Sequence, residues 1–242
     1  MPQENVTQPV LLMRVTSAIH AKDFQNGNMF MNALQTFKDI EDKGNEMTQD
    51  YLEGMKHVVQ ANEFDFVADS SGTPVLSTEH MIGGIHRPDK EAQFQKIICL
   101  FELKLDSDKQ DIQPIDQRIL DFGDTFIMIT DFKEFCRRFE VAIRNSSDIE
   151  PPVYFHNIKY YDPMSYTGGL NVFYKRESYS WQNEWRIALK LKEKNTCPYT
   201  LNIGDLSDIT IIGNTKQLLE TMYLAIDEDG VKLNFENDWN IK

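Results

Sequence analysis

The sequence predicts an α+β protein of one domain, with mixed or antiparallel β-sheets and three or four helices. Segments rich in β-branched and aromatic residues recur along the whole chain and are separated by turn residues. Segments with apolar residues at helical spacing are fewer and lie mostly early and in the middle. A length of 242 residues suits a single large domain. We expect the polar residues 1–8 to be flexible.

The first part of the chain predicts two short helices, each preceded by a strand. Residues 10–16 form an almost unbroken apolar run, which is typical of a buried strand. Ala18 to Gln25 suits a short helix that ends at Gly27. Residues 28–32 predict a strand, and residues 33–42 predict a helix because their apolar residues recur at helical spacing.

The rest of the chain predicts mainly strands and loops, with two further helices. Thr130 or Asp131 can cap a helix that ends near Arg144, and residues 216–225 predict another helix. Residues 162–172 contain a proline and two glycines and predict a loop that could act as a lid. Strands are predicted at residues 64–69, 75–78, 97–105, 124–130, 153–161, 199–203, 208–212 and 231–235.

The charge of the chain argues against one class of function. The net charge is −13 at pH 7, whereas proteins that coat nucleic acids are basic. An acidic protein can still carry a local basic patch, and the candidates here are Lys175, Arg176 and Arg186.

Several targeting and ligand-binding signals are missing from the sequence. There is no apolar run of about 18 residues, so we expect no membrane helix, and the N-terminus does not resemble a secretory signal. The three cysteines are scattered, which argues against a disulfide framework and favours a reducing cytoplasm. Zinc-ligand spacings, a Walker loop and Gly-x-Gly-x-x-Gly are also missing, so we expect neither a metal site nor an ordinary nucleotide-binding loop.

The densest polar and aromatic segment runs from Phe173 to Leu191. From Glu184 onward polar and apolar residues alternate, as in a half-buried strand. Gln182 lies two residues before Glu184, so the two side chains share a face if the strand begins at Gln182. An amide beside a carboxylate can act on a ribose. Alternatively, Glu184 and Arg186 can form an ordinary structural ion pair.

Two other segments carry charges whose partners the sequence does not identify. Arg14 lies within an apolar run and needs either a carboxylate or a bound anion as its partner. A guanidinium matches phosphate oxygens, so a buried ion pair and a phosphate contact both remain open. The acidic turn from Asp50 to Gly54 could line a substrate site, but we expect it to be solvated, because most such turns are.

Three short motifs, in this order along the chain, resemble those of ADP-ribosyltransferases of the bacterial-toxin type. They are Arg14 on an early strand, Ser77-Thr78-Glu79 in the middle, and Gln182-Asn183-Glu184 at a later strand. The resemblance implies an ADP-ribosyltransferase-like fold and an enzyme that transfers ADP-ribose from NAD to a protein or nucleic-acid acceptor. Such an enzyme could be a toxin or a phage-defence effector, with an antitoxin or defence-system partner.

The resemblance implies that two of these residues take part in the chemistry. Release of nicotinamide from NAD leaves positive charge on the ribose, and Glu184 would bind a ribose hydroxyl and stabilise that charge. Gln182 would orient the acceptor.

The other implied residues would bind NAD or support the carboxylate. Arg14 would bind the diphosphate of NAD. Tyr179 or Phe30 would stack on the nicotinamide ring. Ser77 or Thr78 would support Glu184 by hydrogen bonding.

A second resemblance covers more of the chain and implies no activity. Gly27 to Asn32 and Glu184 to Arg186 are similar to segments of an uncharacterised group of bacterial and phage proteins.

Two other classes of function compete with the transferase. A non-enzymatic component of a bacterial or phage defence system would bind its partner through an aromatic patch. A nuclease would hold Mg²⁺ with Asp50, Glu53 and Glu184. The aromatic patch would consist of Tyr154, Phe155, Tyr160, Tyr161 and Tyr166.

Geometry distinguishes these three classes. The transferase requires Arg14 and Glu184 to line one cleft, about a dinucleotide apart. The nuclease requires its carboxylates to converge within metal-bridging distance, and the interaction protein requires its aromatic side chains to be exposed.

Overall fold

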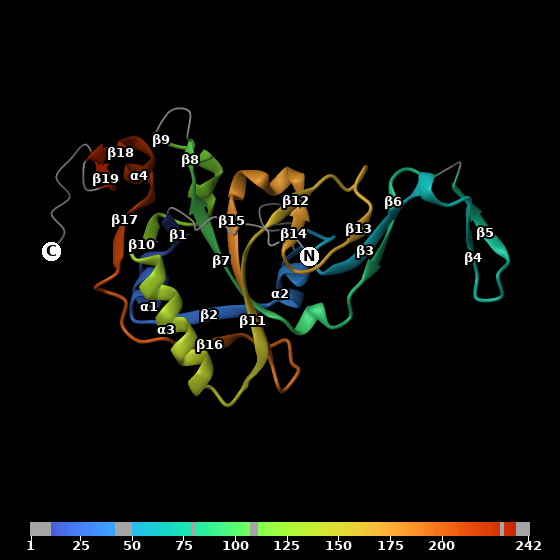
Figure 1. Cartoon of the computed structure of the whole chain (residues 1–242), viewed down its shortest axis with the longest axis horizontal. Helices are drawn as coiled ribbons and strands as arrows, with labels where there is room; N and C mark the ends of the chain where they lie inside the picture. Colours follow the sequence, from blue (N-terminus) through green and yellow to red (C-terminus); the bar gives the residue numbers. More distant parts are fainter. Residues whose placement is uncertain (1–10, 42–49, 79–80, 107–110, 228–229, 236–242) are drawn as a thin grey trace.

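The computed structural model describes residues 11–41, 50–78, 81–106, 111–227 and 230–235. The largest sheet is antiparallel and has eight strands, of which six follow the order β11-β15-β7-β1-β10-β17 (Figure 1). Strand β2 joins this sheet by pairing with β7, and β16 pairs with β2. The strands are β1 (Leu11–Thr16), β2 (Asn28–Ala33), β7 (Lys96–Leu103), β10 (Thr125–Ile129), β11 (Ile149–Asn157), β15 (Glu184–Leu191), β16 (Tyr199–Asn202) and β17 (Thr210–Asn214). The expectation of a mixed fold with antiparallel sheets is therefore confirmed.

The central strands are buried on both faces. Every residue of β10 is buried, as its continuous apolar sequence predicts. In β15 the residues from Glu184 to Leu189 are all buried. The expectation of a half-buried strand here was therefore wrong, because its polar face is also covered by protein.

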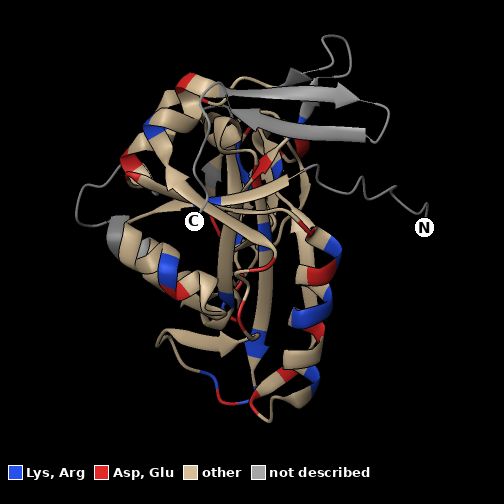
Figure 2. Ribbon diagram, turned by 90° about the vertical axis from the view of Figure 1, so that its left-hand side faces the viewer, with Lys and Arg blue, Asp and Glu red and all other residues tan. Residues whose placement is uncertain are grey.

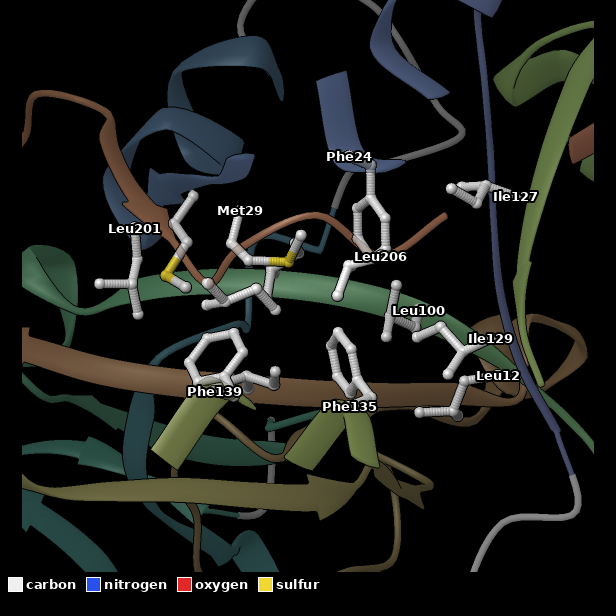
Figure 3. Close-up of a cluster of buried hydrophobic side chains, with 14 of the residues drawn as sticks. Leu12, Phe24, Met29, Leu100, Ile127, Ile129, Phe135, Phe139, Leu201 and Leu206 are labelled. Atoms are coloured by element: carbon white, nitrogen blue, oxygen red, sulfur yellow. The ribbon is translucent and has the colours of Figure 1, made fainter. Parts of the chain in front are cut away.

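The main core lies between the sheet and the helices α1 (Ala18–Gln25) and α3 (Phe132–Asn145). Phe24 of α1 stacks on Phe135 of α3 with ring centroids 6.3 Å apart, and Phe139 lies next along α3 (Figure 3). Alternate residues of the strands, such as Leu12 and Leu100, complete this cluster. The other face of the sheet carries smaller apolar clusters.

The N-terminus of α3 follows from its sequence. Asp131 is the N-cap residue, and its carboxylate accepts a hydrogen bond of 2.8 Å from the backbone N–H of Glu134. Glu134 lies in the first turn, where a negative charge suits the helix dipole. This confirms one of the two capping residues that the sequence predicted.

A smaller sheet extends away from the main body. It contains β13 (Gly168–Gly169), β3 (Met55–Gln60) and β6 (Gly84–Pro88). Beyond it, β4 (Phe66–Ala68) and β5 (Pro74–Ser77) form a hairpin that lies at one end of the molecule (Figure 1).

Short elements complete the described chain. Helix α2 (Leu34–Glu41) follows β2, and β12 (Lys159–Tyr161) pairs in parallel with β14 (Tyr174–Arg176). The remaining elements are the 3₁₀ helices η1 (Ala61–Glu63), η3 (Ala92–Phe94), η4 (Gln117–Phe122) and η5 (Glu177–Gln182), the strand pair β8 (Leu105–Asp106) and β9 (Asp111–Ile112), the helix α4 (Thr215–Thr221), and the strand pair β18 (Met222–Asp227) and β19 (Gly230–Phe235).

Two elements differ from their predictions. The helix predicted at residues 216–225 ends at Thr221, because the following residues pair with β19 as strand β18. Strand β11 begins at Ile149 and runs through Pro151 and Pro152. Proline is tolerated there because β11 is the edge strand of the sheet. The prediction that residues 1–8 are flexible lies outside the described residues.

Charge on the described surface is mixed. Figure 2 shows blue and red segments close together along the helices, whereas the strands of the sheet are mostly tan. None of the helices within the described ranges is long and apolar enough to cross a membrane.

Candidate functional site

A pocket of about 190 Å³ lies beside strand β7. The main sheet divides there, because the pairing along one edge of β7 changes from β1 to β2. Along one edge, β7 pairs with β1 through Phe101 to Leu103 and with β2 through Lys96 and Ile97. Between these pairings, residues 98–100 of β7 pair with neither strand. The pocket is lined by Arg14, Val15, Phe30, Asn32, Phe37, Glu53, Ile97, Ile98, Cys99, Leu100, Phe101, Phe122, Lys175, Gln182, Glu184 and Arg186.

Strand alternation explains why β2 and β15 contribute to this pocket. In β2, Met29 and Met31 enter the main core, so Phe30 and Asn32 project from the other face. In β15, Trp185 enters the same core, whereas Glu184 and Arg186 face the pocket. These elements are distant in sequence and meet only because the sheet divides at β7.

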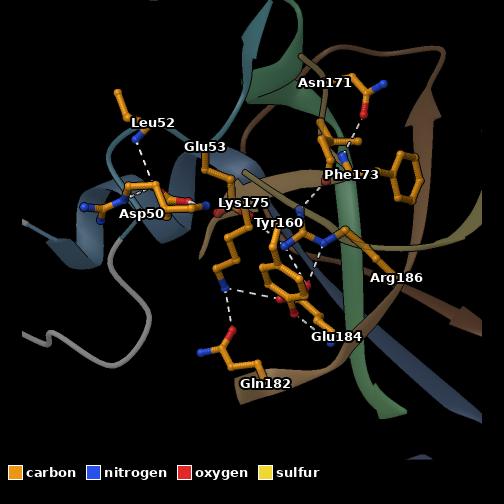
Figure 4. Close-up of polar contacts among 12 residues, drawn as sticks. Asp50, Leu52, Glu53, Tyr160, Asn171, Phe173, Lys175, Gln182, Glu184 and Arg186 are labelled. Atoms are coloured by element: carbon orange, nitrogen blue, oxygen red, sulfur yellow. Dashed lines mark hydrogen bonds and ion pairs between the residues drawn. The ribbon is translucent and has the colours of Figure 1, made fainter. Parts of the chain in front are cut away.

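Two buried cations hold the carboxylate of Glu184 (Figure 4). Lys175 Nζ donates to Glu184 Oε2 at 3.2 Å and to Gln182 Oε1 at 2.7 Å. Arg186 lies 2.6 Å from Glu184 Oε1 and 2.6 Å from Glu53 Oε1, and it also donates to the carbonyl of Val172. The network thus fixes the side chains that form the deep wall of the pocket.

The charges within the network determine its protonation. Burial alone would raise the pKa of Glu184, but Arg186 and Lys175 outweigh burial and hold this pKa at about 2. Burial lowers the pKa of Lys175, yet the nearby Glu184 and Glu53 raise it overall. Glu184 is therefore an anion and Lys175 a cation at neutral pH. Burial raises the pKa of the neighbouring Cys99 to about 12, so its thiol stays protonated.

Arg14 differs from the other cations of the pocket. Within the described part of the chain it has no hydrogen-bond or ion-pair partner, and burial lowers its pKa. Three positive side chains and two negative ones line the pocket, so one net positive charge remains. Of the two partners that the sequence left open for Arg14, the described residues supply no carboxylate.

In the turn from Asp50 to Gly54 every residue except Tyr51 is buried, which corrects the expectation of a solvated turn. Asp50 accepts hydrogen bonds from Arg176 Nε at 2.7 Å and from the backbone N–H of Leu52 at 3.1 Å. The guanidinium of Arg176 also lies 4.3 Å from the ring centroid of Tyr51. The turn is buried because its two acids meet arginines from β14 and β15.

The structure brings together four of the residues that the sequence singled out. Arg14, Phe30, Gln182 and Glu184 all line the pocket. The strand begins at Glu184 and not at Gln182, because Asn183 adopts a left-handed conformation with a φ of 39°. Gln182 nevertheless reaches the same pocket from the end of η5.

Three of the predicted residues lie elsewhere. Ser77 and Thr78 belong to the outer hairpin, and the Thr78 hydroxyl donates to the carbonyl of Asp65 at 3.1 Å, so the structure does not bring them to Glu184 (Figure 1). Tyr179 is buried outside the pocket lining, with Lys175 Nζ 4.9 Å from its ring centroid. Phe30, the other residue for which the resemblance implied stacking, lines the pocket and is 46% exposed.

The loop at residues 162–172 does not cover the pocket. Gln60 Nε2 donates to the carbonyls of Pro163 and Tyr166, and the Gln60 N–H donates to Thr167 Oγ1. These bonds attach the loop to β3, and none of its residues lines the pocket. The expectation of a lid is therefore not supported by the described contacts.

The aromatic patch is also dispersed. Tyr154 is exposed, but Phe155 packs against the main core, Tyr161 is buried, and Tyr166 packs on Tyr161. Tyr160 accepts a hydrogen bond from the backbone N–H of Glu184 at 2.9 Å. The five residues therefore do not form the exposed surface that an interaction protein requires.

The proposed basic patch and the nuclease carboxylates are components of ion pairs. Lys175 and Arg186 are buried, and Arg176 is held by Asp50. The carboxylates of Asp50, Glu53 and Glu184 all bind these cations. No group of three or more possible metal ligands was found among the described residues.

Sequence reasoning missed several residues of the pocket wall. Cys99, Phe37 and Phe122 line it, and Phe122 also packs on Phe101 with ring centroids 5.4 Å apart. Glu53 was considered as part of an acidic turn expected to be solvated, and as a metal ligand. The acidic turn was a weak sequence signal that Glu53 belongs to a site. The sequence held no such signal for Phe37 and Phe122, because phenylalanines of a core and of a pocket look alike in sequence.

Comparisons of the chain with protein-family models, curated proteins and solved structures found no match.

Proposed function

We propose that the protein cleaves the nicotinamide–ribose bond of NAD in this pocket, as an ADP-ribosyltransferase-like enzyme does. The observation that carries this proposal is that Arg14, Phe30, Gln182 and Glu184 line one pocket, although they come from three separate parts of the chain. The transferase required Arg14 and Glu184 to line one cleft about a dinucleotide apart, and it is the shared cleft that supports the proposal.

The charges of the pocket support the proposal. Arg14 supplies a positive charge that no carboxylate among the described residues pairs with, which suits a phosphate of NAD. Phe30 offers an exposed aromatic ring for stacking. A volume of about 190 Å³ is below the range of roughly 300–1,000 Å³ for drug-sized ligands, so only the nicotinamide–ribose end would enter.

Glu184 has the properties of a stabilising carboxylate. A pKa of about 2 keeps it ionised at neutral pH, so it would accept a hydrogen bond from a ribose hydroxyl and would not act as a general acid. Its Oε2 accepts one bond from Lys175, and a carboxylate oxygen has two lone pairs. Consumption of NAD would suit a toxin or a phage-defence effector with an inhibitory partner.

Release of nicotinamide from NAD tests this proposal. We expect wild type and Glu193→Gln to release it, because Glu193 is exposed and lies beyond β15. Glu184→Gln should reduce the rate by roughly 10²-fold or more, since the transition-state charge loses its stabilising group.

Arg14→Met provides a second test, because it breaks no described ion pair and should leave the fold intact. It should weaken NAD binding, measured by calorimetry, whereas Arg87→Met on β6 should not. Thermal unfolding would establish that each variant is folded. Wild type that neither binds NAD nor releases nicotinamide would rule the proposal out.

A further inference from the structure

The walls of the pocket restrict what can accept the ADP-ribose. Gln182 would orient the acceptor, but its side chain is only 4% exposed and its Oε1 already accepts a bond from Lys175 Nζ. Glu184 is 6% exposed and Lys175 is 5% exposed. The polar groups that would contact an acceptor are therefore beneath the surface, and Figure 4 shows how Lys175, Gln182 and Glu184 point toward one another.

The volume of the pocket strengthens this restriction. About 190 Å³ is available to both reactants. Phe37, Phe101 and Phe122 occupy parts of the wall as rigid rings. A water molecule takes up about 30 Å³ in the liquid, whereas a protein side chain or a nucleobase is several times larger and brings its backbone with it.

The charge distribution also argues against a nucleic-acid acceptor. Of the cations that line the pocket, Lys175 and Arg186 are paired with buried carboxylates, and Arg14 is assigned to the diphosphate of NAD. Arg176, outside the pocket lining, is paired with Asp50. These cations cannot form a surface that holds a phosphate backbone, and the net charge of −13 opposes such an acceptor further.

We infer that the acceptor is water, so that the protein hydrolyses NAD to nicotinamide and ADP-ribose. This inference rests on the proposed function. The oxygen of water forms a bond to C1′ of the nicotinamide ribose while the bond from C1′ to the ring nitrogen breaks. The electron pair of that bond goes to the nitrogen, which loses its positive charge. The water loses one proton to solvent.

The products of NAD cleavage test the inference. Wild type is incubated with adenine-labelled NAD, first alone and then with a cell lysate that supplies protein and nucleic acid. We expect one free ADP-ribose for each nicotinamide in both reactions, with the label remaining acid-soluble. Nicotinamide release that requires the lysate, with label in the precipitate, would overturn the inference and leave the proposed function standing. No nicotinamide release in either reaction would overturn both.

The size limit can be tested with alcohols that compete with water. Methanol should yield methyl ADP-riboside, whereas 2-propanol at the same concentration should yield roughly tenfold less of its product, because a pocket discriminates against an added carbon group by about tenfold or more. Gln182→Ala removes most of one side chain that lines the pocket. The enlarged pocket should raise the share of the 2-propanol product. Equal use of both alcohols by wild type would contradict an enclosed acceptor site.

Product binding gives a readout that does not depend on turnover. ADP-ribose should raise the thermal unfolding temperature of wild type and of Gln182→Ala, and it should stabilise Arg14→Met much less. If ADP-ribose stabilised none of these proteins, the pocket would not be the site of hydrolysis and the inference would fail.

Discussion

At the scale of single residues, the site depends on charges that compensate one another. Glu184 is buried, yet it remains ionised because Arg186 and Lys175 lie against its two oxygens. Arg186 in turn is shared with Glu53. Removal of one member leaves its partner buried and uncompensated, which typically costs about 3–5 kcal/mol.

The depressed pKa of Glu184 predicts how stability depends on pH. A carboxyl whose pKa falls on folding stabilises the protein above its unfolded pKa, and this contribution is lost as the pH falls towards about 2. Between pH 5 and pH 3, wild type should lose on the order of 2 kcal/mol of unfolding free energy that Glu184→Gln does not lose. Denaturant unfolding at each pH measures this difference.

The control for this experiment is Glu193→Gln, which removes an exposed carboxyl outside the network. Its unfolding free energy should follow that of wild type at every pH. If the curve of Glu184→Gln also ran parallel to that of wild type, Glu184 would not be held ionised by its neighbours.

Single residues also show what the sequence could reveal of the site. Arg14, Gln182 and Glu184 were found because their order along predicted strands matched a known pattern. Asp50 and Glu53 were expected to be solvated, because local sequence does not indicate their partners. Those partners, Arg176 and Arg186, lie 126 and 133 residues away, and only the fold brings them together.

At the scale of elements, apolar patterning predicted the central strands well. The runs at β1, β7 and β10 are continuous because both faces of the sheet are covered. The end of α4 was not predicted, because residues 222–225 fit a helix equally well and form β18 only through pairing with β19. The division of the sheet at β7 was also not predictable, since it depends on which strands pair.

The capping of α3 leads to a prediction at this scale. Asp131→Ala removes the acceptor for the N–H of Glu134, so the unfolding free energy should fall by about 1 kcal/mol. Asp131→Asn keeps a side-chain acceptor and should be close to wild type. Urea unfolding distinguishes the variants. A loss of the same size for both would mean that charge at the helix dipole matters more than the hydrogen bond.

At the scale of the whole molecule, the pocket belongs to the main sheet and the projecting hairpin does not. None of the pocket-lining residues comes from β4 or β5. The ends of this hairpin already lie close together, because the N–H of Thr78 donates to the carbonyl of Asp65 at 3.4 Å. The hairpin therefore resembles an insertion that the main core does not need.

Removal of the hairpin tests this arrangement. Residues 66–77 are replaced by Asn-Gly, which suits a tight turn between the paired ends. The unfolding free energy should change by less than about 1 kcal/mol, because the apolar clusters of the main sheet remain complete. Binding of ADP-ribose, measured by calorimetry, should equal that of wild type, because the walls of the pocket are unchanged. A large loss of stability would show that the hairpin folds as part of the main core. A loss of binding in a stable variant would instead show that the hairpin shapes the pocket from a distance.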